Sequence, residues 1–369
     1  MINNNVLGII FSSAYDEKIR EMTNIRTMGS IPFAGRYRLI DFVLSNMVNC
    51  GISKVGVITK SNYQSLLDHL GSGKAWDLSR KTDGMTILPP FNLGSGGVYS
   101  SRIEALSNVM DFITGCRKDY VVLADCNAIC NIDYDEILNM HEKNGADITI
   151  AYKNGEVPDI DDRMVLTLDE NKRVTEVAVS PAVGVADFSL NIIVISRMLL
   201  ERLINDAKSQ NFKSFEQDII QNNVSNLKIY GYEVKEYAKV IDSLQSYYDI
   251  SMGLVKGDYK KLFNKERPVY TKSRDHMPAT YGISSSVNNS LVGDGCIIKG
   301  KVENSIIFRG VTIEEGAEIK NSIIMQDTFI GSGAKINCAI LDKGVVVKPA
   351  RELSGAPTYP LYVGKKIIV

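Results

Sequence analysis

The apolar positions of residues 1–255 form short continuous runs that alternate with segments of helical spacing. Val6–Phe11 and Tyr120–Ala124 are continuous runs, which are typical of strands buried on both faces. Leu39–Cys50 and Tyr134–Lys143 have helical spacing, and a glycine follows each within two residues. This alternation predicts an α/β fold with a doubly wound, mostly parallel, Rossmann-like sheet. Such sheets bind ligands at the carboxyl ends of their strands.

Three local features of the same region add detail. Met164–Leu168 and Arg173–Val179 flank a short polar turn and predict a hairpin. His141 lies near the end of a predicted helix, so we expect it to be solvated. Gly94–Gly97 is rich in glycine but follows no predicted strand, which favours a loop near the mouth of a pocket over a phosphate-binding turn.

From Tyr281 to about Pro349 the pattern changes to a short repeat. Val311–Ile324 is echoed by Thr328–Leu341, with aliphatic residues about six positions apart between glycines and small polar residues. This pattern predicts a left-handed parallel β-helix of hexapeptide repeats with about four coils, which must stack because each is too small to bury its own apolar face. Asn-Ser or Asn-Cys dipeptides recur at intervals of 15, 17 and 16 residues, beginning at Asn289, Asn304, Asn321 and Asn337.

The segment between these two patterns predicts a linker. Residues 256–280 contain lysine, arginine and the prolines Pro268 and Pro278. The chain therefore divides into an α/β domain at 1–255, a linker at 256–280, and a β-helix domain with a C-terminal tail at 281–369.

Composition excludes several classes of protein. A formal net charge of −1 over 369 residues gives no electrostatic basis for binding nucleic acid or an anionic membrane. No apolar run approaches the ~20 residues that span a bilayer, and the first residues lack the basic region of a signal peptide. The six cysteines are scattered, and Cys126 and Cys130 have no second pair nearby. We therefore expect free thiols in a reducing cytoplasm and no zinc site.

Several strings of the first domain resemble a known family. Together with the predicted architecture, they make the chain similar, collinearly over nearly its whole length, to glucose-1-phosphate adenylyltransferase (ADP-glucose pyrophosphorylase) of bacterial glycogen synthesis. The resemblance implies a nucleotidyltransferase-like first domain and the reaction of ATP with glucose 1-phosphate to give ADP-glucose and pyrophosphate. The strings are Phe33–Phe42, Leu44–Asn46, Gly51–Ile52, Val57–Thr59, Gln64–Leu66 and His69–Leu70.

The phosphate-binding groups that the resemblance implies are missing. Catalytic members carry a glycine-rich loop after the first strand, where backbone amides approach the phosphates closely. Asp16 and Glu17 would repel a triphosphate there, and Lys18 keeps one positive charge. The family's neighbouring phosphate-binding lysine falls on Met28, and its glucose 1-phosphate lysine falls on Ser180. The loop positions contain no glycine: Ser13, Ala14, Tyr15, Asp16, Glu17 and Lys18.

The resemblance also implies two Mg²⁺-binding aspartates, and the chain departs from the family at both. The first position reads Asn127, with Asp125 two residues earlier as a candidate for a rebuilt ligand. The second position reads Val240, and the nearby Asp242 is expected to cap the helix at Ser243–Leu254. No intact metal site or catalytic residue is therefore expected.

These losses together predict a non-catalytic or weakly catalytic cytoplasmic protein of the family's divergent regulatory subunit type. The resemblance implies a hetero-oligomer with a catalytic glucose-1-phosphate adenylyltransferase subunit, as an α₂β₂-like hetero-tetramer, and no required cofactor. The alternative is an active nucleotidyltransferase with a rebuilt metal and phosphate site, which would need Mg²⁺. The residues left for contact with a nucleotide or a sugar phosphate are Lys18, Arg36, Asp125 and Asp242.

A third class, the β-helix acyltransferases, is disfavoured. Acyltransferases with hexapeptide repeats usually need a histidine base that faces the repeat. The three histidines, His69, His141 and His276, all lie outside residues 281–349.

Overall fold

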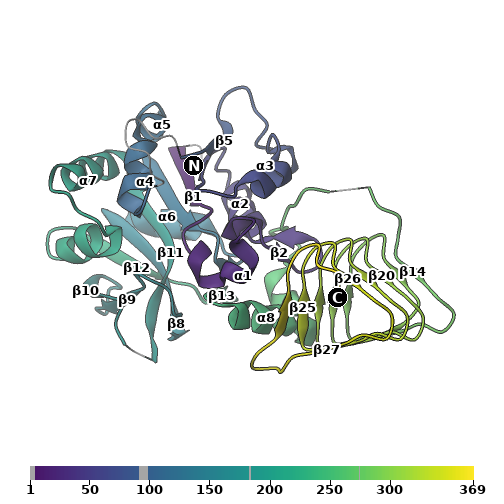
Figure 1. The fold of residues 1–369 in the computed structure, drawn as a ribbon. Helices are drawn as coiled ribbons and strands as arrows, with labels where there is room; N and C mark the ends of the chain where they lie inside the picture. The colour runs from purple at the N-terminus through teal and green to yellow at the C-terminus, as the bar shows by residue number, and fades with distance from the viewer. Residues whose placement is uncertain (1–4, 91–98, 183, 274) are drawn as a thin grey trace.

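The computed structural model describes residues 5–90, 99–182, 184–273 and 275–369, which form an α/β domain beside a β-helix (Figure 1). Within these residues, no helix is long and apolar enough to cross a membrane.

A nine-stranded sheet forms the centre of the α/β domain, in the order β10-β9-β11-β6-β1-β4-β5, with β8 and β12 continuing from β11. As expected from the alternation of strands and helices, β6, β1, β4 and β5 are parallel. The expected parallel order does not extend to β11, which runs antiparallel to β6, while β9 and β10 form the predicted hairpin. The strands are β1 (Val6–Phe11), β4 (Lys54–Ile58), β5 (Gly84–Leu88), β6 (Tyr120–Asp125), β8 (Ile148–Glu156), β9 (Met164–Leu168), β10 (Val174–Val179), β11 (Val185–Ser196) and β12 (Ile229–Glu233).

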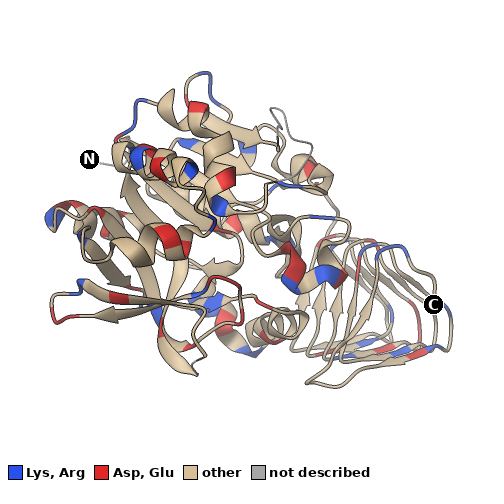
Figure 2. Ribbon diagram, turned by 60° about the vertical axis from the view of Figure 1, so that its left-hand side comes forward, with Lys and Arg blue, Asp and Glu red and all other residues tan. Residues whose placement is uncertain are grey.

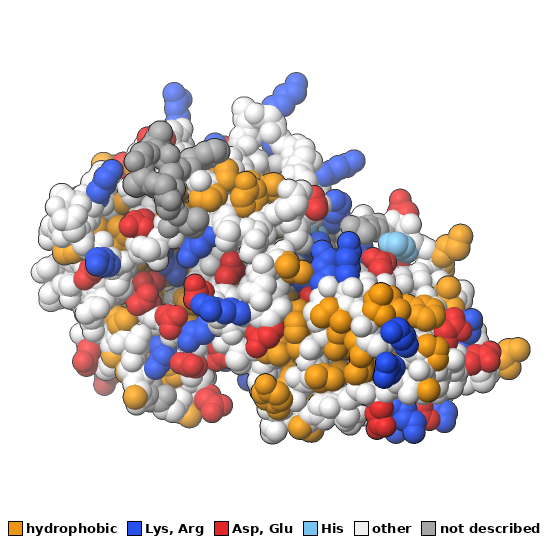
Figure 3. Space-filling view, in the orientation of Figure 1, with side chains coloured by type: hydrophobic (Ala, Val, Ile, Leu, Met, Phe, Trp, Pro, Cys, Tyr) orange, Lys and Arg blue, Asp and Glu red, His pale blue; other side chains and the backbone are white. Residues whose placement is uncertain are grey.

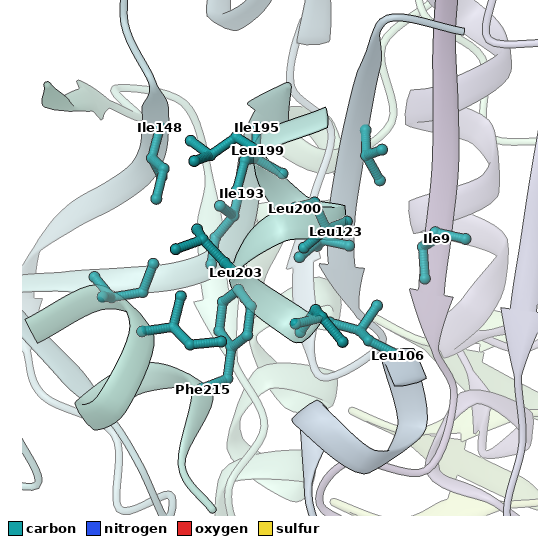
Figure 4. Close-up of a cluster of buried hydrophobic side chains, with 14 of the residues drawn as sticks. Ile9, Leu106, Leu123, Ile148, Ile193, Ile195, Leu199, Leu200, Leu203 and Phe215 are labelled. Atoms are coloured by element: carbon teal, nitrogen blue, oxygen red, sulfur yellow. The ribbon is translucent and has the colours of Figure 1, made fainter. Parts of the chain in front are cut away.

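Helices cover both faces of this sheet, and each face has its own apolar core. Leu7 and Ile9 of β1 pack toward α4, α5 and α7, in the core drawn in Figure 4. Val6 and Ile10 pack toward α2, α3 and α6 on the opposite face, so β1 is buried on both sides. The helices are α1 (Arg20–Thr23), α2 (Leu39–Asn49), α3 (Gln64–Leu70), α4 (Arg102–Asn108), α5 (Met110–Thr114), α6 (Tyr134–Lys143), α7 (Arg197–Ser209), α8 (Leu244–Gly253) and α9 (Tyr259–Leu262).

The prediction of a solvated His141 is wrong. His141 is 2% exposed, and its Nδ1 lies 2.9 Å from the Thr149 hydroxyl on β8. Burial lowers the pKa of His141 to about 4. The last turn of α6 faces the sheet, so this histidine is a neutral part of the core.

Five coils stack in the β-helix, one more than the repeat suggested. The corners at Asn289, Asn304 and Asn321 have positive φ, which asparagine tolerates better than most residues. The next corner is Cys338 (φ 48°) and not Asn337, so the last interval between corners is 17 residues. The strands are β14 (Thr280–Tyr281), β15 (Ser286–Asn288), β16 (Leu291–Val292), β17 (Ile297–Ile298), β18 (Lys301–Glu303), β19 (Ile306–Ile307), β20 (Thr312–Ile313), β21 (Glu318–Lys320), β22 (Ile323–Ile324), β23 (Phe329–Ile330), β24 (Lys335–Asn337), β25 (Ala339–Leu341), β26 (Val346–Val347), β27 (Glu352–Ser354) and β28 (Leu361–Val363).

The three sheets of the β-helix present different surfaces. The domain-facing sheet, β16-β19-β22-β25-β28, packs Ile306, Ile323 and Ile340 into one core with Phe42 and Tyr247 of the α/β domain. The charged sheet, β15-β18-β21-β24-β27, carries exposed ion pairs such as Lys301–Glu318 at 3.2 Å. The third, here called the apolar sheet, is β14-β17-β20-β23-β26.

The outward row of the apolar sheet has no charged residue at its six positions. Strand pairing and one further bridge place six residues in register along it. Three of them are large apolar side chains that remain exposed: Ile297 at 44%, Phe329 at 39% and Ile368 at 63%. Figure 3 shows hydrophobic side chains gathered on the near face of the β-helix. The row consists of Thr280, Ile297, Thr312, Phe329, Val346 and Ile368.

The start of the predicted linker is helical. A π-helical turn at Leu254–Asp258 and α9 extend the first domain to Leu262. Beyond them the chain follows α2, where the Tyr270 amide donates to the Ser45 hydroxyl at 2.8 Å. Residues 263–279 that the structure describes contain no helix or strand.

Candidate functional site

A cavity of about 510 Å³ lies at the carboxyl ends of β1 and β4, next to the point between β1 and β6 where the strand order of the sheet reverses. Its walls come from the segments after these strands, the start of α4 and the π-helical turn Phe215–Ile220. This is the place at which an open α/β sheet binds ligands. The glycine-rich segment Gly94–Gly97, expected near such a mouth, lies outside the described residues.

The described lining of the cavity is polar and of mixed charge. It contains three basic side chains and four acidic ones, so it offers no net positive field to a triphosphate. Acidic and basic residues are interspersed in the same way across both domains (Figure 2). The charged lining residues are Lys60, Arg102, Lys213, Glu17, Asp161, Asp162 and Glu216.

The segment after β1 is held by side chains in place of a glycine turn. The Ser12 hydroxyl donates to the Ile58 carbonyl at 2.8 Å, and the Lys60 amide donates to the Ser13 hydroxyl at 3.3 Å. Tyr15 is 7% exposed, and its hydroxyl accepts from Asn191 Nδ2 at 2.7 Å. Ser13, Ala14 and Tyr15 therefore line the cavity with side chains where the resemblance implies bare backbone.

Asp16 does not face the cavity, contrary to the expectation that it would repel a triphosphate. Its Oδ1 accepts from the Met28 amide at 2.6 Å. Burial raises the pKa of Asp16 to about 7, although the bond from Met28 opposes the shift. The neighbouring Glu17 does line the cavity and keeps the expected negative charge there.

Lys18 does not line the cavity either. Its Nζ lies 3.3 Å from Asp161 and 3.7 Å from Asp159, two exposed carboxylates. The one cation that the sequence leaves in the loop is therefore paired with the protein itself.

Asp125, the candidate for a rebuilt metal ligand, is held by an arginine. Arg102 Nη2 donates to Asp125 Oδ2 at 2.9 Å, and Arg102 Nε lies 2.9 Å from Glu216 Oε1. Burial lowers the pKa of Arg102, but Asp125 and Glu216 raise it by more, so the guanidinium stays charged. The Arg102 guanidinium also lies over the Phe11 ring, at 4.5 Å from its centroid.

Backbone hydrogen bonds hold together the segments that carry the two expected metal positions, Asn127 and Val240. Val240 on β13 (Ala238–Val240) pairs with Ala128 on β7 (Ala128–Cys130), and the Asn127 carbonyl accepts from the Ile241 amide at 2.9 Å. Asn127 is 2% exposed, and its Nδ2 is buried without a hydrogen-bond partner among the described residues.

The sequence suggested that Asp242 caps α8, but this prediction is wrong. Ser243 is the N-cap residue, and its hydroxyl accepts from the Ser246 amide at 3.1 Å. Asp242 Oδ2 accepts from the Asp159 amide at 2.9 Å, and Asp242 Oδ1 accepts from the Ser243 hydroxyl at 2.9 Å. This carboxylate therefore ties a surface loop to the start of α8.

The remaining predicted positions do not meet at the cavity. Met28 is buried in the core between the domains, in a 3₁₀ turn at Met28–Ser30. Ser180 is exposed in a loop with a φ of 52°. Arg36 is exposed, with its guanidinium 5.8 Å from the Tyr37 ring centroid.

The Mg²⁺ that the resemblance implies does not fit these residues. Asp125 is paired with Arg102, Asn127 is neutral, and Val240 is apolar. Among the described residues, no three His, Cys, Asp or Glu side chains are grouped so that they could hold a metal ion. These residues therefore form neither a binding site for a divalent cation nor one for phosphate.

Sequence reasoning missed Arg102 and Glu216, the residues that decide the character of this cavity. They are 23 and 91 residues from Asp125 in the chain, and neither belongs to a short motif. A serine N-cap at Ser101 before Arg102 was the one local signal that a helix starts at the cavity.

The comparisons with known proteins agree with this fold. A family model described as nucleotidyl transferase matches residues 7–254, and a model described as GlmU-like, C-terminal hexapeptide matches residues 277–355. Glycogen biosynthesis protein GlgD of Bacillus subtilis (strain 168) is 38% identical over 369 residues, which cover 100% of this chain and 98% of the relative. Glycogen biosynthesis protein GlgD of Geobacillus stearothermophilus is 38% identical over 320 residues, or 86% of this chain and 84% of the relative.

A relative with an enzyme name is also similar. Glucose-1-phosphate adenylyltransferase of Thermosipho africanus (strain TCF52B) is 32% identical over 321 residues, which cover 86% of this chain and 78% of the relative. The fold and the position of the cavity define a nucleotidyltransferase-type domain joined to a hexapeptide β-helix. The chain belongs to the glucose-1-phosphate adenylyltransferase family, which includes the GlgD proteins.

Proposed function

We propose that this chain is a non-catalytic or weakly catalytic regulatory subunit of glucose-1-phosphate adenylyltransferase in cytoplasmic glycogen biosynthesis. The relatives named glycogen biosynthesis protein GlgD support this pathway. The observation that carries the proposal is the ion pair between Arg102 and Asp125, which engages the one carboxylate left at the end of β6.

The loss of catalysis follows from what adenylyl transfer requires. The reaction needs cations and amides that stabilise charge on the phosphates of ATP in the transition state. In this chain Lys18 is paired with aspartates, Met28 is in the core, and Ser180 is in a remote loop. Each missing group contributes on the order of a few kcal/mol, and ~1.4 kcal/mol is tenfold in rate. Catalysis by the isolated chain should therefore be orders of magnitude below that of a catalytic relative.

The proposed partner is a catalytic adenylyltransferase subunit, in an α₂β₂-like hetero-tetramer. The apolar sheet supports an assembly role, because its uncharged row is exposed while the domain-facing sheet is already covered. The polar side chains beside it, including the Lys299–Glu314 pair at 2.9 Å, resemble the polar rim of a protein interface. Relatives named glucose-1-phosphate adenylyltransferase match most of this chain, which favours a partner of similar architecture.

A cavity of this size also favours a retained ligand. Polar residues such as Ser13, Tyr99 and Ser214 line it, which suits a polar ligand such as a nucleotide or sugar phosphate. The rival function, an active nucleotidyltransferase with a rebuilt site, requires Asp125 and Lys18 to be available, and both carry ion-pair partners. Binding without turnover is therefore the role that we propose for the cavity.

The assembly is tested by mixing the chain with a catalytic adenylyltransferase subunit from the same organism and measuring mass by light scattering after gel filtration. We expect a species with two copies of each subunit. Elution of the two proteins as separate species across the micromolar range would contradict the regulatory role.

A further inference from the structure

Arg102, which lines the cavity, links the buried carboxylates of Asp125 and Glu216. Its Nη2 lies 2.9 Å from Asp125 Oδ2 and its Nε lies 2.9 Å from Glu216 Oε1. The three side chains are each more than nine-tenths buried, with exposures of 8%, 0% and 4%. Arg102 is the first residue of α4, directly after the N-cap Ser101, so the helix start fixes where the guanidinium lies.

Two features show that this group is more than an ordinary ion pair. Asp125 Oδ1 and Arg102 Nη1 are both buried without a hydrogen-bond partner among the described residues. In addition, one positive charge is shared between two carboxylates, which would otherwise repel each other and attract a divalent cation. Arginine cannot lose its charge in a protein, so its positive charge between the two carboxylates is permanent.

We propose that Arg102 is a built-in cation that replaces a divalent metal at the end of β6, so that the cavity binds small molecules without Mg²⁺. The proposal deepens the proposed function, because it accounts for how the fold keeps Asp125 buried after metal-dependent chemistry is lost. Arg102 lines the cavity, so a ligand would lie beside a fixed positive charge, which suits a group with an acceptor oxygen.

The proposal is tested with Mn²⁺ alone as the probe, by electron paramagnetic resonance of the free ion. The wild-type chain is expected to show no saturable Mn²⁺ site here, whereas Arg102→Ala should gain one site whose affinity exceeds any residual Mn²⁺ binding of the wild type at least tenfold. The double variant R102A/D125N should lose that gain. Arg102→Lys keeps a cation and should remain metal-free.

Lys60→Ala is the matched control, because Lys60 is a cavity cation whose Nζ lies over the Tyr99 ring and not beside these carboxylates. It should gain no Mn²⁺ site. If R102A is unfolded without metal, its circular dichroism is measured with 1 mM Mn²⁺: recovery that D125N abolishes supports the proposal, and no recovery overturns it. Binding of Mn²⁺ by the wild-type chain that Asp125→Asn removes, or no gain in a folded R102A, overturns it as well. These measurements use the isolated chain, so their failure is separate from any failure to assemble with a partner.

Discussion

Arg26 and Asp342, which are 316 residues apart in the chain, form a buried ion pair that joins the two domains. Arg26 Nη2 donates to both carboxylate oxygens of Asp342, at 2.9 and 2.7 Å, and the side chains are 2% and 0% exposed. The Tyr362 hydroxyl donates to the same carboxylate at 2.7 Å. The contact fixes the segment before Met28 against the last coils of the β-helix.

Removing the arginine alone should destabilise this joint strongly. Arg26→Met leaves Asp342 as a buried charge without a cation, which should cost about 3–5 kcal/mol in the free energy of unfolding. The double variant R26M/D342N should recover most of that loss, because asparagine is neutral and still accepts from Tyr362. Urea unfolding at pH 7 measures both. Equal stability of the single and double variants would show that the charge of Asp342 is not the cause.

The raised pKa of Asp16 predicts that the stability of the folded chain decreases as the pH rises. Its pKa is about 7 in the folded chain and ~3.9 when unfolded, so the folded state binds more protons between these values. Stability therefore falls as pH rises from about 4 to 7. Asp16→Asn keeps an acceptor for the Met28 amide and should raise stability on the order of 4 kcal/mol at pH 8, with little effect at pH 4.

Thermal melts from pH 4 to 8 check this prediction, and Glu17→Gln serves as the control because Glu17 is exposed and pairs with Arg20 on the surface. A gain for D16N that is the same at pH 4 and pH 8 would contradict the account of Asp16.

We expect a charge introduced into the apolar sheet to weaken association with the catalytic subunit. Phe329→Lys places a charge in the middle of the exposed row and should weaken association with the catalytic subunit by at least tenfold. The melting temperature of the isolated chain should change little, since Phe329 points outward. Ser354→Lys on the charged sheet is the matched control, and it should assemble as the wild type does. Analytical ultracentrifugation of the mixtures gives the dissociation constants. Equal weakening by both variants would mean that the apolar row is not the contact.

The elements that the sequence predicted well depend on local patterns. Val6–Phe11 is apolar throughout because both faces of β1 are covered, and the hairpin of β9 and β10 needs only its own turn. The prediction that His141 is solvated was wrong because helical spacing alone does not show that the end of α6 packs on Thr149.

The sequence predicts which family residues the candidate site has lost, but not which residues have taken their place. The missing glycines between Ser13 and Lys18 are visible in the sequence alone. The partners that replaced the lost chemistry are contacts between separate elements: Arg102 with Asp125, 23 residues apart, and Asp16 with Met28, 12 residues apart. Such contacts depend on the fold, so no local pattern could predict them.

The central claim is tested most directly by measuring ADP-glucose formation from ATP, glucose 1-phosphate and Mg²⁺. The assay compares the isolated chain, a catalytic subunit from the same organism, and the two mixed. We predict that the isolated chain is orders of magnitude slower than the catalytic subunit, and that the mixture is faster than the catalytic subunit alone. Robust turnover by the isolated chain that Asp125→Ala abolishes would contradict the account.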